Sequence, residues 1–152
     1  MCIIVDTSCL HHVANSTECG RPIVKWLLNP NKLSGLIVGG KLHDELRRSS
    51  FERRRKEAFF QTLRVLREAG RLHIFTGSEV QQKTEELEKG KIRSDDPHVV
   101  ALAIISKCNL VFTEDKDLEM DLKTRSLVGH KVSIYKNNSH TRLLTTCRCT
   151  SS

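Results

Sequence analysis

The sequence predicts an α/β fold, with a central parallel β-sheet flanked by helices on both faces. Five short runs rich in apolar and β-branched residues alternate with segments of helical spacing, which is typical of parallel strands joined by helices. The runs do not alternate with polar residues, as expected for strands that are covered on both faces. The predicted strands are residues 2–5, 36–38, 72–75, 110–112 and 131–135.

The segments between these runs carry helix signals. Residues 51–68 form the clearest predicted helix, with apolar side chains at helical spacing and Gly70 just past the end. Acidic residues at 95–96 precede Pro97, which suits a first helical position, and the apolar residues that follow predict a buried helix. The predicted helices are residues 7–13, 22–28, 41–48, 51–68, 78–89, 97–105 and 115–123.

The length and composition indicate one globular domain. The chain has 152 residues and a mass of 17.3 kDa, and it contains 38% hydrophobic and 28% charged residues. We expect the folded domain to span residues 1–136. Because the chain is rich in Asn, Ser and Thr after Lys136, we expect a polar, flexible tail over residues 137–152.

The sequence favours a cytoplasmic location. Its apolar stretches are far shorter than the ~20 residues of a membrane-spanning helix. The N-terminus lacks the basic and apolar regions of a secretory signal. We therefore expect the six cysteines to be reduced thiols rather than a disulfide framework or a zinc site.

Positive charge is concentrated in two parts of the chain. The formal net charge is +7; residues 41–71 carry ten Lys/Arg against five Asp/Glu, and residues 122–152 carry six Lys/Arg and no acid. Such segments attract polyanions, although a run of charge can also be a solvated helix face. The candidate nucleic-acid-binding residues are Arg47, Arg48, Arg53, Arg54, Arg55 and Lys56.

Several carboxylates follow the predicted strands at one edge of the sheet. Asp6 ends the first strand, and Asp115 follows the fourth strand and Thr113. Ligands bind beyond the carboxyl ends of parallel strands, so these acids are placed where a ligand would lie. The further candidates at this edge are Glu45, Asp95, Asp96 and Asp117.

Converging carboxylates repel one another unless a cation neutralises them. Oxygen ligands without His or Cys suit Mg²⁺ or Mn²⁺, and such an ion supports phosphodiester hydrolysis. Individually, Asp6, Asp96 and Asp115 are also good helix N-caps, but caps need not share one sheet edge. Thr7 and Ser8 are either structural polar groups or accessory groups that orient water or phosphate.

Four separated blocks of the sequence resemble the PIN-domain nucleases. The blocks are a strand ending in Asp6-Thr7-Ser8, Glu45-Leu46 on a helix after the second strand, the segment from Asp96 to Ala103, and the segment Thr113-Glu114-Asp115-Lys116-Asp117-Leu118. They span residues 2–122. The Arg-rich helix and the cysteine-containing C-terminal segment depart from the family's pattern.

The resemblance implies a three-layer PIN-like nuclease domain and a metal-dependent endonuclease, commonly acting on RNA. It implies that Asp6, Glu45, Asp96 and Asp115 are catalytic and hold Mg²⁺ or Mn²⁺. It also implies that Asp117 is an additional metal-binding acid and that Thr113 is an accessory polar group. The adjacent acid Asp95 leaves the position of the third ligand open by one residue. Many small members are VapC-type toxins that dimerise and are silenced by an antitoxin.

We therefore expect an Mg²⁺- or Mn²⁺-dependent endoribonuclease, with a homodimer and an antitoxin or another regulatory protein as candidate partners. One alternative is a non-catalytic nucleic-acid-binding or assembly module whose acids serve only as caps. It predicts salt-sensitive RNA binding that is independent of divalent ions. A nuclease of the same fold that acts on DNA, including single-stranded DNA, is the other alternative.

Overall fold

The computed structural model describes residues 2–15, 17–39, 53–75, 78–90 and 92–146. Its centre is a five-stranded, all-parallel sheet in the order β3-β2-β1-β4-β5. The strands are β1 (Cys2–Val5), β2 (Gly35–Gly39), β3 (Leu72–Phe75), β4 (Leu110–Phe112) and β5 (Ser133–Tyr135). The α/β fold class and the parallel sheet predicted from the sequence are therefore confirmed.

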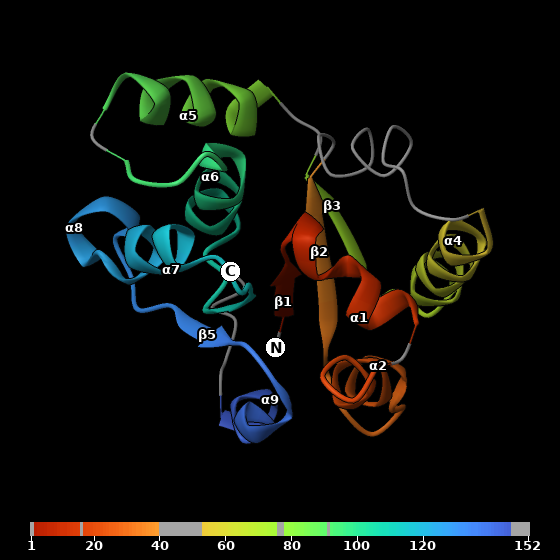
Figure 1. Cartoon of the computed structure of the whole chain (residues 1–152). Coiled ribbons are helices and arrows are strands. Elements are labelled where there is room, and N and C mark those ends of the chain that lie inside the picture. The colour runs from red at the N-terminus through yellow and green to blue at the C-terminus, as the bar shows by residue number, and fades with distance from the viewer. Residues whose placement is uncertain (1, 16, 40–52, 76–77, 91, 147–152) are drawn as a thin grey trace.

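Helices cover both faces of this sheet (Figure 1). On one side lie α1 (Leu10–Ala14), α2 (Arg21–Leu28) and α4 (Arg53–Glu68), and on the other lie α5 (Ser78–Lys89), α6 (Pro97–Ser106), α7 (Lys116–Lys123) and α8 (Arg125–Val128). Short 3₁₀ helices, η1 (Thr7–Cys9) and η2 (Asn138–His140), and the short helix α9 (Leu143–Thr146) complete the described elements.

Alternate strand residues enter two separate cores, as the pleat of a strand requires. Ile3 and Val5 of β1 pack with the cluster beneath α1, α2 and α4, whereas Ile4 packs with the cluster beneath α5 to α8. The predicted buried helix is α6, in which Pro97 to Ala103 are all buried. The strands β1, β2 and β4 contain no charged or strongly polar residue because they supply both cores, whereas the edge strand β3 carries the exposed His73 and Ile74.

The end of the chain differs from the expected tail. Residues 138–140 and 143–146 are helical, and Leu144 is only 4% exposed, in the same core cluster as Tyr135. Up to Thr146, therefore, the segment expected to be a polar tail contains short helices and one buried side chain. An apolar pair, Leu143 and Leu144, stabilises a segment whose other residues are mostly polar. Residues 147–152 lie outside the described part.

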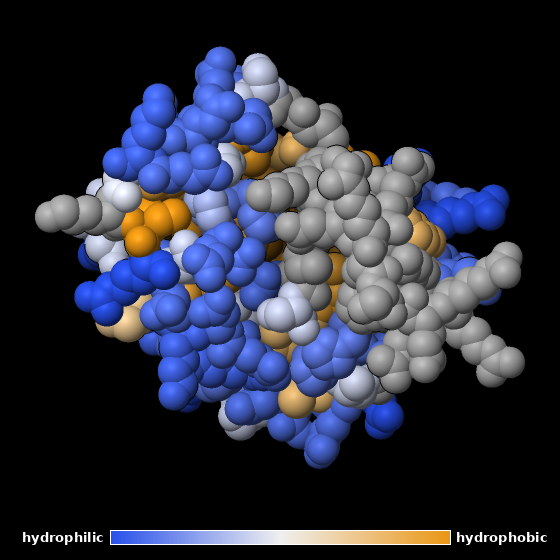
Figure 2. Space-filling model, turned by 45° about the horizontal axis from the view of Figure 1, so that its top comes forward, coloured by the Kyte–Doolittle hydropathy of each residue, from blue (hydrophilic) through white to orange (hydrophobic). Residues whose placement is uncertain are grey.

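The remaining differences are small. The fifth strand begins at Ser133 instead of residue 131. The predicted helix 41–48 lies outside the described residues. No helix in the described part is both long and apolar enough to cross a membrane. Hydrophilic side chains cover most of the described surface on the face shown in Figure 2, with small hydrophobic areas between them.

Candidate functional site

The candidate site lies where the order of the strands reverses. From β1 the chain builds the sheet outward through β2 and β3, then returns to the other side of β1 to form β4 and β5. The carboxyl ends of β1 and β4 therefore form a topological switch point, the usual place for a ligand in such a sheet. Val5 pairs with Phe112, and the Asp6 N–H donates to the Phe112 carbonyl over 2.9 Å.

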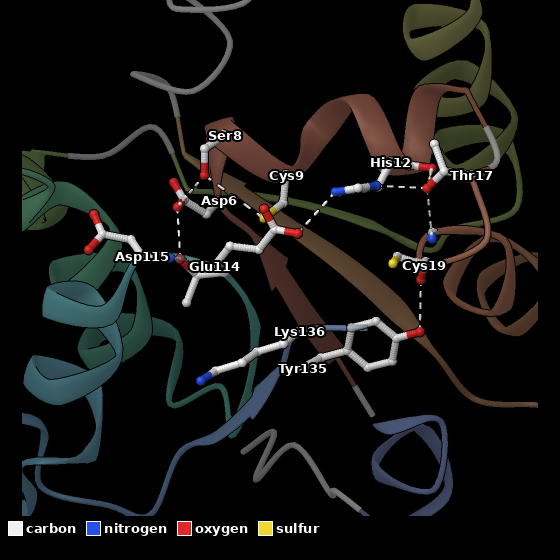
Figure 3. Close-up of polar contacts among 12 residues, drawn as sticks. Asp6, Ser8, Cys9, His12, Thr17, Cys19, Glu114, Asp115, Tyr135 and Lys136 are labelled. Atoms are coloured by element: carbon white, nitrogen blue, oxygen red, sulfur yellow. Dashed lines mark hydrogen bonds and ion pairs between the residues drawn. The ribbon is translucent and has the colours of Figure 1, made fainter. Parts of the chain in front are cut away.

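Asp6 is a buried carboxylate held by hydroxyl groups. The residue is 2% exposed, and its Oδ2 accepts a hydrogen bond of 2.9 Å from Ser8 Oγ (Figure 3). The same oxygen accepts a second hydrogen bond of 2.9 Å from Thr113 Oγ1. Among the described residues, no Lys, Arg or His forms an ion pair with it. Because a buried carboxylate is unfavourable without partners, these two hydroxyl hydrogen bonds compensate part of the cost of its burial.

Thr113 joins Asp6 to Asp115. The Thr113 hydroxyl is fully buried; it donates to Asp6 and accepts from the Asp115 N–H over 3.1 Å. Asp115 in turn caps α7, because its Oδ1 accepts from the N–H groups of Asp117 and Leu118 at 2.9 and 3.2 Å. We call Asp6 and Asp115 the acid pair. Asp117 is exposed on the first turn of α7.

Asp96 occupies the N-cap position of α6, but its side chain makes no capping hydrogen bond. The simple capping interpretation of this acid is therefore wrong. The adjacent Asp95 is exposed, so the two acids differ in burial, with Asp96 the more buried.

The segment before these acids is anchored by Asp121, which the sequence analysis missed. This side chain is 4% exposed; it accepts from Arg93 N at 3.0 and 3.1 Å and from Ser94 N at 2.8 Å. Asp115 and Asp121 lie at the start and within the last turn of α7, so one helix supports both acidic segments. The sequence did contain a signal for Asp121. It lies three residues after Leu118, which places this acid on the apolar face of the predicted helix.

A histidine supports the same edge from α1. His12 Nε2 lies 3.2 Å from Glu114 Oε1, and Nδ1 lies 2.7 Å from Thr17 Oγ1 (Figure 3). The ring stacks on Phe112 with the centroids 5.6 Å apart. His12 thus connects α1 to the residue between Thr113 and Asp115. Nothing in its local sequence indicated this contact, which joins residues 102 positions apart.

Cys9 lies beside Asp6, and its thiol is fully buried. Burial raises the pKa of Cys9 to about 12; a hydrogen bond with Ser8 opposes this shift, and the negative charges of Asp6 and Glu114 add to it. The four described cysteines, Cys2, Cys9, Cys19 and Cys108, are all free thiols, as expected.

The acid pair fits a hard divalent cation in its donor chemistry. Two hydroxyl oxygens contact the Asp6 carboxylate, and neither acid has a cationic partner among the described residues. Within that part of the chain, however, no three His, Cys, Asp or Glu side chains are grouped closely enough to bind a metal together. The four-ligand set inferred from the resemblance stays a prediction.

Several candidates fall outside what the structure describes. Glu45, Arg47 and Arg48 lie in the segment 40–52, and the side chain of Thr7 is also outside the described part. The basic run Arg53–Lys56 forms the first turn of α4, but its side chains are not described. The predicted basic surface is therefore not tested.

The fold and this edge define an α/β protein with an acid pair at its switch point. A chain in the crystal structure described as "VapBC2 from Rickettsia felis bound to a DNA fragment from their promoter" is similar to it, with a TM-score of 0.54 and 15% identity. The match covers 90% of this chain and 100% of that chain, so the likeness in fold extends over nearly the whole molecule. Searches of protein-family models and of curated proteins found no match.

Proposed function

We propose that this chain is a metal-dependent endonuclease that hydrolyses RNA and acts as the toxin of a toxin–antitoxin pair. The observation that carries the proposal is the buried carboxylate of Asp6, joined through Thr113 to Asp115 at the switch point. The fold likeness to a chain of a VapBC2 complex supports the PIN-like assignment and an antitoxin partner. That complex is described as bound to DNA, which also supports nucleic acid as a ligand class.

In this proposal Asp6 and Asp115 hold Mg²⁺ or Mn²⁺, with Asp96 and Glu45 as further ligands and Asp117 and Asp95 nearby. A bound ion of this kind lowers the pKa of water and stabilises negative charge on a phosphoryl oxygen. Thr113 keeps the acid pair in register through its two hydrogen bonds. Ser8 donates a hydrogen bond to Asp6 Oδ2, and Asp6 itself is buried.

A non-catalytic nucleic-acid-binding module is the second candidate, and one observation favours it. Asp115 already serves as the N-cap of α7, so its carboxylate has a structural role without any metal. In this second reading the acid pair stabilises the fold, and basic residues alone bind the polymer.

Cleavage assays separate the two candidates. The parent protein and Asp6→Asn are incubated with labelled single-stranded RNA and single-stranded DNA, with Mn²⁺ or with EDTA. Glu85→Gln, on the exposed surface of α5, is the matched acid-to-amide control. We expect Mn²⁺-dependent RNA cleavage by the parent and the control, and its loss in Asp6→Asn. Equal cleavage by Asp6→Asn contradicts the proposed mechanism, and preferential DNA cleavage contradicts the RNA substrate.

A further inference from the structure

Two lysines share one glutamate beside the candidate site. Glu119 of α7 accepts from Lys123 through Oε1 at 2.8 Å and from Lys136 through Oε2 at 2.5 Å. We call Lys123 and Lys136 the lysine pair. The two lysine hydrogen bonds hold the pKa of Glu119 below its ordinary value of 4.5, although partial burial opposes the shift. Glu119 therefore remains a fixed anion that orients both ammonium groups.

Lys136 lies at the same sheet edge as the acid pair, and Lys123, at the end of α7, reaches back to Glu119. Glu119 is one helical turn from Asp115, since its N–H donates to the Asp115 carbonyl over 3.0 Å. Lys136 directly follows Tyr135, whose carbonyl accepts from the N–H of Thr113 over 3.2 Å. Figure 3 shows the Lys136 side chain extending from the end of β5 toward the side on which Asp115 lies.

The lysine pair carries one more charge than its shared glutamate. Glu119 offsets one of the two positive charges, while Asp115, Asp117 and Asp121 precede Lys123 on the same helical segment. Lys123 and Lys136 have side-chain exposures of 58% and 39%, so both can reach a ligand. Each ammonium has three N–H donors and gives one to Glu119, which leaves donors for a second anion.

We infer that Lys123 and Lys136 form a binding site for a nucleic-acid backbone phosphate, on the β5 side of the acid pair. The inference rests on the proposed function, because it assigns part of the same substrate's path. Glu119 acts as a positioning residue that presents both amines together. A phosphate bound here would hold the polymer on the β5 side of the sheet, away from β2 and β3. An acidic protein segment is the competing occupant.

The test is RNA binding in EDTA, which is measured without cleavage. Fluorescence anisotropy of a labelled single-stranded RNA is followed against KCl concentration for the parent, Lys136→Gln and Lys123→Gln/Lys136→Gln. Lys131→Gln is the matched control, because Lys131 is exposed and lies before β5, at the opposite edge of the sheet. Lys136→Arg keeps the charge and tests for rescue.

Loss of one phosphate contact lowers the slope of log affinity against log salt by about 0.7, which at 0.1 M salt is about fivefold in affinity. We expect an affinity about fivefold lower in Lys136→Gln and about 25-fold lower in the double variant. Lys136→Arg should recover the affinity of the parent, and Lys131→Gln should change it little. Equal effects of Lys136→Gln and Lys131→Gln, or an unchanged slope, overturn the inference. The inference is also overturned if the lysine variants bind RNA like the parent but lose affinity for an acidic peptide.

The two proposals fail in different ways. If the parent cleaves RNA with Mn²⁺ but the lysine variants bind RNA like Lys131→Gln, the phosphate site is wrong and the nuclease stands. If RNA binding depends on the lysine pair but the parent never cleaves, the nuclease is wrong and the phosphate site stands.

Discussion

Replacing Asp121 is expected to be among the more damaging single changes in the described structure. Its carboxylate is 4% exposed and satisfies the backbone N–H groups of Arg93 and Ser94. A hydrogen bond to a charged group contributes about 1.5–3 kcal/mol, so Asp121→Ala, which strands both donors, should cost about 3–6 kcal/mol of the free energy of unfolding. Asp121→Asn keeps one acceptor oxygen and should cost about half as much.

Thermal unfolding followed by circular dichroism measures this loss. For a domain of this size, each kcal/mol corresponds to roughly 2–4 °C in Tm, so Asp121→Ala should unfold about 6–24 °C below the parent. Glu88→Gln, an exposed acid on α5, is the control and should stay within about 1 kcal/mol of the parent. Hydrogen exchange should accelerate at the amides of Arg93 and Ser94. An Asp121→Ala protein as stable as the Glu88→Gln control would refute this account of the anchor.

Three further outcomes follow from the same structure. Because Cys9 is buried and its pKa is raised to about 12, iodoacetamide at pH 8.5 should leave it unmodified in the native protein and modify it after unfolding in urea. Labelling of Cys9 in the native protein, detected by mass spectrometry, would contradict this assigned environment. Because the pKa of Glu119 is lowered on folding, its contribution to stability is present above about pH 4.5 and is lost as the pH falls through the folded-state pKa. In urea titrations, Glu119→Gln should therefore lose less stability than the parent between pH 5 and pH 3. An equal loss in the two proteins would count against the lysine contacts. Leu144→Ala should cost about 2–4 kcal/mol in urea unfolding, whereas Leu33→Ala, at a residue 91% exposed, should cost almost nothing; equal stability of the two would mean that α9 is not packed on the core.

The sheet and most helices could be predicted because their signals are local. The strand 72–75 and the helix 78–89 have the predicted boundaries, and α6 begins at Pro97 as expected. In each case the element is specified by residues close together in the sequence: an apolar run, apolar residues at helical spacing, or a proline at the first helical position. The packed segment after Lys136 was missed because its stability comes from one buried side chain, Leu144, among polar neighbours.

The candidate site could be predicted only in part. The positions of Asp6 and Asp115 follow from strand ends and parallel topology, which sequence patterns reveal. The contacts of Asp121 with Arg93 and Ser94, and of His12 with Glu114, join segments far apart in the sequence. No local pattern specifies such pairings, because they depend on how helices pack against one another across the sheet.

The central claim is that the acid pair holds a divalent metal ion, and calorimetric titration of Mn²⁺ tests it most directly. The parent is compared with Asp6→Asn/Asp115→Asn and with Glu85→Gln, after circular dichroism has established that all three are folded. The account predicts binding to the parent and to Glu85→Gln, and its loss in the double variant. Absence of Mn²⁺ binding to the folded parent, or undiminished binding to the double variant, would contradict it.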